Sequence, residues 1–349
     1  MSKSYIYAAV AGYVGRPEAE GKVGIFRREG ADGAWVNVLP GLEAYTVNVH
    51  PTDANVVLAG TEDGVYRSTD AGATFTRANF PDTKKQVWCF LVDSRDPKRI
   101  LAGASPVDIY RSDDMGASWR LMPNPNIPSR CEGPFAHRVM RMVQSPTRPD
   151  EVYAALEIAG AARTLNFGES WDDCSLHLLE LAEQPHLKSK IVTQSFAEGM
   201  LDGHAITMSA ADPDGVILAC RMGLFRSTDK GRTWTDMEMG RFSPTTYGRD
   251  VKVSPQDPKT IYAALSVAAA SHDGGVYRST DAGQTWSRYD KVQVHGTIMS
   301  IGLSQSDPNK FIIGARYQGE VFATADGGAT WQAMPIPGPV KDIYGVASN

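Results

Sequence analysis

The chain has 349 residues, a hydrophobic content of 42% and a formal net charge of −5 at pH 7. This composition is sufficient for a folded core, and the negative charge argues against non-specific binding to nucleic acid. The opening residues MSKSYIYAAV contain no long apolar run or cleavage-site pattern, so we expect no export signal, no membrane span and a cytoplasmic location.

In chain order, the predicted elements repeat as a unit of four strands. In the first complete unit, residues 45–49 form an inner strand, residues 56–59 a second strand and residues 65–67 a third, and a tight turn over residues 68–75 leads into the fourth. The same pattern predicts further inner strands at residues 87–92, 139–143, 206–208, 251–253 and 298–303.

The turn between the third and fourth strands is the most regular feature of the sequence. In GVYRSTDAGQTW, residues 275–286, Gly283 can adopt a positive φ, and the side chains of Ser279 and Asp281 can accept hydrogen bonds from the turn backbone. Related turns close on aromatic residues at intervals of 40 to 63 residues, at Trp35, Phe75, Trp119, Trp171, Trp234, Trp286 and Trp331. A period of this length with several strands per unit predicts a β-propeller or an array.

The two ends of the chain complement each other. Residues 5–10 have the pattern of a second strand with no inner strand before it, and residues 341–347 have the pattern of an inner strand with nothing after it. Pairing the two would remove the exposed sheet edges at the seam. We therefore predict an all-β fold over residues 1–349, a single seven-bladed β-propeller of four-stranded antiparallel blades closed by the C-terminal strand.

The Ser-x-Asp-x-Gly-x-Thr-Trp turns resemble the Asp-box, or BNR, repeats of sialidase-like, sortilin-like and xyloglucanase-like propellers. Five copies carry the full pattern, and Asn166 replaces the aspartate in the copy that ends at Trp171. The resemblance implies a propeller fold. It does not select one function, because this repeat serves glycosidases, receptors and assembly factors.

The strand order also assigns the loops to two faces. The Asp-box turns and the turns after the inner strands belong to one face, which we call the Asp-box face. The opposite face, the insertion face, receives the long segments at residues 12–24, 123–138, 172–203, 238–249 and 266–274. Because loops on a rigid scaffold commonly carry function, we expect the ligand site on the insertion face.

Histidines on the insertion face suggest a metal site. His137, His204 and His295 each precede an inner strand in a different blade. Three imidazoles meeting at the axis would suit zinc, iron or copper, so a divalent metal is one expected cofactor. The alternative is that they are exposed or hydrogen-bonded loop histidines.

A second group would bind substrate. Several guanidinium groups meeting at one mouth would suit a carboxylate, sulfate or phosphate, although exposed ion pairs with neighbouring acids are the alternative. The predicted substrate-binding residues are Arg138, Arg141, Arg221, Arg249, Arg316, Tyr247 and Tyr317.

The predicted catalytic residues are His204, Glu157 at the end of a second strand, and Asp250 in an inner strand. Together these features favour a soluble enzyme, a hydrolase or lyase acting on a small anionic or sugar-like substrate at the channel mouth. The family resemblance implies glycosidase-like chemistry, with a small molecule or glycan as ligand and no nucleic-acid or membrane partner. The alternative is a non-catalytic interaction or assembly propeller. The sequence leaves the oligomeric state open.

Overall fold

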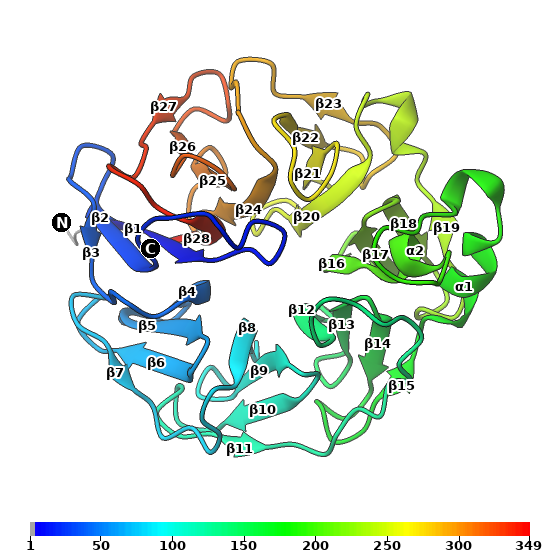
Figure 1. Ribbon diagram of the computed structural model, residues 1–349, viewed down its shortest axis with the longest axis horizontal. Coiled ribbons are helices and arrows are strands. Elements are labelled where there is room, and N and C mark those ends of the chain that lie inside the picture. The colour runs from blue at the N-terminus through cyan, green and yellow to red at the C-terminus, as the bar shows by residue number, and fades with distance from the viewer. Residues whose placement is uncertain (1–3) are drawn as a thin grey trace.

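The computed structural model describes residues 4–349, which form seven four-stranded antiparallel sheets around one axis (Figure 1). The predicted seven-bladed β-propeller is confirmed. Residues 1–3 of the predicted domain lie outside the described range. None of the helices in residues 4–349 has the length and apolar character needed to cross a membrane.

Each blade contributes one strand to each of four concentric positions. The inner strands are β4 (Ala44–His50), β8 (Gln86–Val92), β12 (Arg138–Gln144), β16 (Gly203–Ser209), β20 (Tyr247–Val253), β24 (Ile298–Leu303) and β28 (Asp342–Ser348). The second strands are β1 (Tyr5–Ala11), β5 (Asp53–Thr61), β9 (Ile100–Ser105), β13 (Val152–Glu157), β17 (Asp212–Cys220), β21 (Ile261–Ser266) and β25 (Phe311–Ala315).

The outer half of each blade is shorter. The third strands are β2 (Gly24–Glu29), β6 (Gly64–Ser68), β10 (Ile109–Ser112), β14 (Gly160–Thr164), β18 (Gly223–Ser227), β22 (Gly274–Ser279) and β26 (Val321–Thr324). The outermost strands have two residues each: β3 (Val36–Asn37), β7 (Thr76–Arg77), β11 (Arg120–Leu121), β15 (Asp172–Asp173), β19 (Thr235–Asp236), β23 (Ser287–Arg288) and β27 (Gln332–Ala333).

The ring closes as predicted, with β28 as the inner strand of the first blade. β28 pairs antiparallel with β1, and the register joins Ile6 to Ser348 and Ala11 to Asp342. The resulting sheet has the order β28-β1-β2-β3, so the first and last strands of the chain lie side by side in one blade (Figure 1).

The Asp-box turns are small hydrogen-bonded units at the outer edge of the blades. The Ser279 hydroxyl donates to Asp281 Oδ1 (2.7 Å) and accepts from the Gly283 N–H (2.8 Å). The Thr285 N–H donates to Asp281 Oδ1 at 2.9 Å, and the Trp286 indole N–H donates to the Gly283 carbonyl at 3.2 Å. Gly283 has a φ of 87°, the conformation predicted for it. The turn satisfies its own backbone, which fits a structural role.

The long insertions carry the helical segments of the described chain. The segment between β15 and β16 contains α1 (Leu176–Ala182), a 3₁₀ turn (Pro185–Leu187) and α2 (Glu198–Leu201), and a second 3₁₀ turn (Met239–Arg241) precedes β20. The segment between β1 and β2 reaches toward the centre of the ring (Figure 1).

The inner strands share a local irregularity that positions the site. In every blade the pairing register of the inner strand skips one residue close to its insertion-face end, which leaves a β-bulge. The skipped residues, which we call the bulge ring, are Tyr45, Trp88, Met140, His204, Arg249, Met299 and Tyr344.

The apolar members of the bulge ring fill the axis. Tyr45 and Trp88 stack with ring centroids 4.1 Å apart, and Tyr344 lies edge-on to both. Met140 and Met299 belong to the same buried cluster. Because these side chains occupy the insertion-face end of the channel, this end is packed.

Candidate functional site

The polar members of the bulge ring, His204 and Arg249, belong to a buried charged cluster on the insertion face. Glu157 at the end of β13 and Asp202 just before β16 complete its centre. One carboxylate oxygen of each acid and one ring nitrogen of His204 lie within 4.8 Å of one another. All three side chains are buried.

His204 is held on both ring nitrogens. Nδ1 lies 2.7 Å from the Gly248 carbonyl oxygen, which can only accept, so Nδ1 carries a proton. Nε2 lies 3.2 Å from the Tyr247 hydroxyl and 3.3 Å from Asp202 Oδ2. The ring is therefore fixed in orientation, with Nε2 directed at the acid.

Asp202 is ionised by its neighbours. Arg221 forks onto Oδ2, with Nε at 2.9 Å and Nη2 at 2.6 Å. Burial on its own would raise the pKa of Asp202, but His204 and Arg221 outweigh it and hold that pKa well below its usual range. The second oxygen, Oδ1, is buried and has no hydrogen-bond partner within residues 4–349.

Glu157 is bounded by two arginines. Arg138 Nη1 donates to Oε2 at 3.0 Å, and Arg249 Nη1 lies 3.7 Å from Oε1. The Arg138 guanidinium also lies between two aromatic rings, 4.2 Å from the Trp88 centroid and 3.7 Å from the Phe135 centroid. This stacking orients Arg138 toward the acid.

These contacts do not suit a metal ion at the centre of the cluster. Two carboxylates and an imidazole are suitable ligand types. However, both nitrogens of His204 are already engaged, and the guanidinium groups of Arg138, Arg221 and Arg249 contact the two acids. The positive charges of these three guanidinium groups, each in contact with one of the acids, would repel a divalent cation.

The structure does not bring the three histidines of the predicted metal site together. His137 Nε2 bonds to the Cys131 carbonyl (2.8 Å), and the exposed His295 pairs with Glu320 (2.7 Å). Within the described part of the chain, the grouping that gathers metal-ligand atoms contains His204 alone of the three. His204 is the bulged residue of β16, whereas His137 and His295 precede their inner strands and bond to other partners.

Arg316 and Tyr317 belong to a second group on the same face. Arg316 is buried, donates to Asp342 Oδ2 at 3.1 Å and lies over the Tyr13 ring at 4.1 Å. Arg16 adds a contact to Asp342 at 3.4 Å and covers the Tyr317 ring. Burial raises the pKa of Asp342, although Arg316 opposes the shift. Residues 12–24 therefore dock on the channel mouth through Tyr13 and Arg16.

A pocket of about 220 Å³ opens between these two groups. Its walls include the aromatic rings of Tyr13, Tyr45, Trp88 and Tyr344. Its polar lining residues include Arg16, Glu43, Gln86, Arg138 and Lys341. Flat aromatic faces combined with charged groups would suit a sugar ring that carries polar substituents.

Arg141 and Asp250 lie apart from the insertion-face cluster. Both line a different cavity, formed by the later halves of the inner strands. The Asp250 carboxylate accepts the N–H of Val251 (3.0 Å) and the N–H of Ile301 (2.8 Å). The structure thus separates these two residues from His204 and Glu157, with which they were grouped from the sequence.

Of the residues predicted from the sequence, the structure gathers His204, Glu157, Arg138, Arg221, Arg249 and Tyr247. It adds Asp202, which sequence reasoning missed. The sequence feature that could have predicted Asp202 is its position two residues before His204, at the start of an inner strand.

Comparison with known proteins agrees with the architecture. The BNR/Asp-box repeat family matches residues 277–288. Xyloglucanase Xgh74A of Acetivibrio thermocellus is 26% identical over 221 residues, which cover 56% of this chain and 25% of that protein. The chain thus spans about a quarter of the length of that curated relative.

Two solved structures share the fold. A GH74 xyloglucanase from Xanthomonas campestris has a TM-score of 0.63 at 14% identity, over 95% of this chain and 47% of that one. YCF48 from Cyanidioschyzon merolae has a TM-score of 0.58 at 14% identity, over 88% of this chain and 90% of that one. With the repeated turns and the seven closed blades, these findings identify the chain as a seven-bladed β-propeller that carries a BNR/Asp-box repeat at residues 277–288.

Proposed function

We propose that this protein is a glycoside hydrolase that acts on the insertion face, with Glu157 and Asp202 as its pair of reacting carboxyl groups. The observation that carries the proposal is the closeness of the two acids, whose nearest ligand oxygens lie within 4.8 Å. Retaining glycosidases hold their two carboxyl groups about 5–5.5 Å apart, whereas inverting enzymes need a wider gap for water. A retaining mechanism fits this spacing better.

The surroundings of the two acids suggest different roles. Asp202 is kept ionised and has one oxygen, Oδ1, without a protein partner, so it suits the nucleophile. Glu157 would protonate the leaving oxygen and later activate water. His204 acts as a positioning residue, because Nδ1 is held by the Gly248 carbonyl and Nε2 faces Asp202.

The substrate would be a glycan. The pocket lined by Tyr45 and Trp88 borders Glu157 through Arg138, which lines the pocket and also donates to Glu157. Arg16 and Arg138 at this pocket favour a sugar that carries an acidic group. The sequence likeness to a protein named xyloglucanase supports a glycan in general.

The test is release of reducing ends from xyloglucan and from uronic-acid oligosaccharides by the purified full chain. We expect turnover by the wild type and a loss of roughly a thousandfold in Asp202→Ala and Glu157→Gln. Azide should restore turnover in Asp202→Ala as a glycosyl azide, because a small anion can replace a missing nucleophile. Arg241→Gln, at an exposed position outside the cluster, is the matched control.

Glycan binding by the wild type without release of reducing ends would overturn the hydrolase proposal. Full turnover in folded Asp202→Ala would overturn the assignment of the nucleophile. Circular dichroism of each variant separates loss of chemistry from loss of fold.

One observation favours a second candidate, a protein-binding propeller. The insertion at residues 172–203 exposes four large apolar side chains, Leu176, Ile191, Val192 and Phe196. Exposed apolar groups gathered on one segment are common at interaction sites. This alternative would be supported if the wild type releases no reducing ends but binds a protein partner, and if the double variant Ile191→Ser/Phe196→Ser no longer binds that partner.

A further inference from the structure

The far end of the channel contains a cavity that the proposed hydrolase does not use. It has a volume of about 420 Å³ and is lined by residues of β4, β12, β16, β20, β24 and β28. The lining begins after the bulge ring on these strands and continues into the following turns at Pro255 and Gln305. It therefore faces the Asp-box end, and the packed aromatic cluster separates it from the insertion face.

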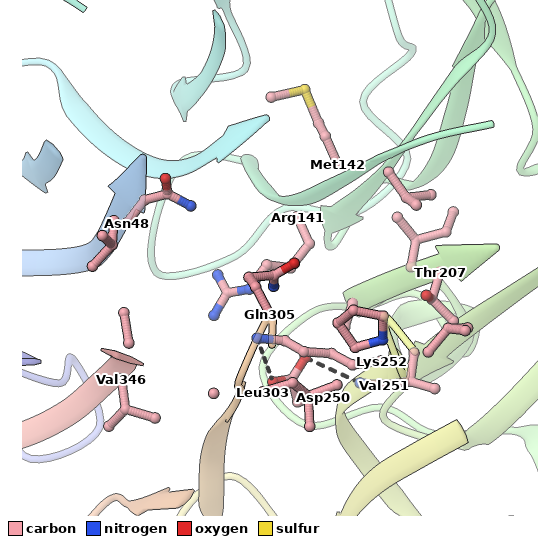
Figure 2. Close-up of a pocket in the computed structure, with 18 of the residues that line it drawn as sticks. Asn48, Arg141, Met142, Thr207, Asp250, Val251, Lys252, Leu303, Gln305 and Val346 are labelled. Atoms are coloured by element: carbon pink, nitrogen blue, oxygen red, sulfur yellow. Dashed lines mark hydrogen bonds and ion pairs between the residues drawn. The ribbon is translucent and has the colours of Figure 1, made fainter. Parts of the chain in front are cut away.

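Two positive side chains enter this cavity. Figure 2 shows Arg141 and Lys252 directed into the same space between the inner strands. Arg141 Nη1 donates to the Met140 carbonyl (2.7 Å) and to the Trp88 carbonyl (3.4 Å), while its Nε and Nη2 make no hydrogen bond within residues 4–349. Nη1 of the guanidinium is thus held by the backbone, and Nε and Nη2 can donate to a ligand.

The cavity lining contains two basic side chains, Arg141 and Lys252, and one acidic side chain, Asp250. Asp250 lies 3.7 Å from Lys252 Nζ, and its two oxygens also accept backbone N–H groups from Val251 and Ile301. Lys252 Nζ also donates to the Ile301 carbonyl, and burial lowers the pKa of Lys252, although Asp250 opposes the shift. When Lys252 is protonated, it and Arg141 outnumber Asp250, and the lining carries a net charge of about +1. A positive cavity in a chain of net charge −5 is not explained by overall composition.

An unsatisfied amide lies on the opposite wall. Asn48 Oδ1 is buried and has no hydrogen-bond partner among the described residues, and Figure 2 shows the Asn48 side chain facing the cavity. A buried amide oxygen without a hydrogen-bond donor is costly, so a polar occupant of the cavity would stabilise this wall. By rotation about its last bond the amide can present either oxygen or NH₂.

We propose that this cavity binds a small oxyanion, a carboxylate or a phosphate, between Arg141, Lys252 and Asn48. The free edge of the Arg141 fork matches the geometry of either anion, Lys252 supplies a second charge, and the Asn48 amide donates from the other side. The apolar lining, which includes Val49, Met142 and Leu303, would cover a short hydrocarbon part of the ligand.

The experiment is isothermal titration of the purified full chain with inorganic phosphate and, separately, with citrate, at low ionic strength. We expect binding by the wild type and a loss of about tenfold or more in Arg141→Gln and in Lys252→Met, since each removes a charged contact. Asp250→Asn should bind several-fold more tightly, because the carboxylate no longer neutralises Lys252. Arg241→Gln removes the same charge from the exposed rim and should bind as the wild type does.

Arg141→Lys is a control for a folding defect, because it keeps the positive charge and removes the guanidinium fork. Its affinity for the anion should lie between those of the wild type and Arg141→Gln.

Tighter binding of citrate than of phosphate would identify a carboxylate ligand, and tighter binding of phosphate would identify a phosphate ligand. Absence of heat with both probes would overturn the proposal. So would equal affinity in the wild type, Arg141→Gln and Lys252→Met, which would place the anion elsewhere. Glycan turnover is measured separately, so failure here leaves the proposed hydrolase untouched.

Discussion

At the scale of single residues, one aspartate in each well-formed Asp-box turn accepts the hydrogen bonds that close the turn. Asp281 accepts N–H groups from Gln284 and Thr285 and the Thr285 hydroxyl, which closes the turn without any ligand. In the copy with asparagine, Asn166 Oδ1 accepts the Ser170 N–H at the same distance of 2.9 Å. A neutral amide oxygen can therefore accept at the same position in the turn as a carboxylate oxygen.

We expect Asp281→Ala to lower the free energy of unfolding by about 1–2 kcal/mol, because backbone donors of the turn lose their acceptor. Asp281→Asn should cost less, as Asn166 indicates. Urea unfolding of the two variants checks this order. Glycan turnover per folded molecule should stay at the wild-type level, and a drop in a fully folded variant would contradict a purely structural turn.

The pH dependence of this difference follows from the same contacts. Hydrogen bonds from Thr285 lower the pKa of Asp281 to about 2. A group with a lowered folded-state pKa contributes stability above its unfolded pKa of about 3.9, and loses it as the pH falls through the folded value. The stability gap between the wild type and Asp281→Asn should therefore narrow from pH 5 to pH 2.

Asp202 and Arg221 show the opposite case, a buried pair whose parts depend on each other. Removing Arg221 leaves the Asp202 carboxylate buried beside His204 alone. We expect Arg221→Met to cost about 3 kcal/mol of folding stability. Asp202→Asn combined with Arg221→Met should cost less than the sum of the single changes, as thermal unfolding of the four proteins would report. Additive losses would mean that the pair does not couple.

At the scale of elements, the inner strands decide which side chains reach the axis. The bulge near the start of each inner strand frees one residue from the ladder, and the bulge ring contains aromatic, thioether, imidazole and guanidinium groups. Apolar members pack the axis, while His204 and Arg249 meet Glu157 and Asp202. One repeated backbone feature thus produces both a plug and a candidate site.

The closing strand β28 is the element on which the ring depends most directly. Deleting residues 341–349 should expose the edge of β1 and the apolar surface that Ile343 and Val346 cover. We expect aggregation and a lower unfolding temperature, measured by light scattering and calorimetry. A synthetic peptide of residues 341–349 should restore part of the stability, and a scrambled peptide should not. A truncated chain as stable and monomeric as the wild type would contradict closure by this strand.

At the scale of the whole molecule, the propeller offers two chemically different ends. The insertion end is packed by Tyr45, Trp88 and Tyr344 and bordered by a closed network of ion pairs. The Asp-box end keeps an open cavity with Arg141 and Lys252. Because the aromatic cluster lies between them, a ligand at one end has no contact with a ligand at the other.

The sequence by itself determined the repeat, the number of blades, the closing strand and the face that receives the insertions. These features follow from local rules: strand alternation with period two, turn residues that set positive φ, and strand edges that need partners. They are therefore readable from residues 275–286 and their copies.

Only the tertiary structure decided which side chains meet. Asp202 joins Glu157 although they are far apart in the chain, while His137 and His295 turn to partners near their own blades. Asp250 and Arg141 lie beyond the bulge in their strands and so face the other end of the channel. A one-residue bulge moves the side chains that follow it to the opposite face of the sheet. The residue pattern of a strand shows that side chains alternate, but it does not show where a bulge shifts that alternation.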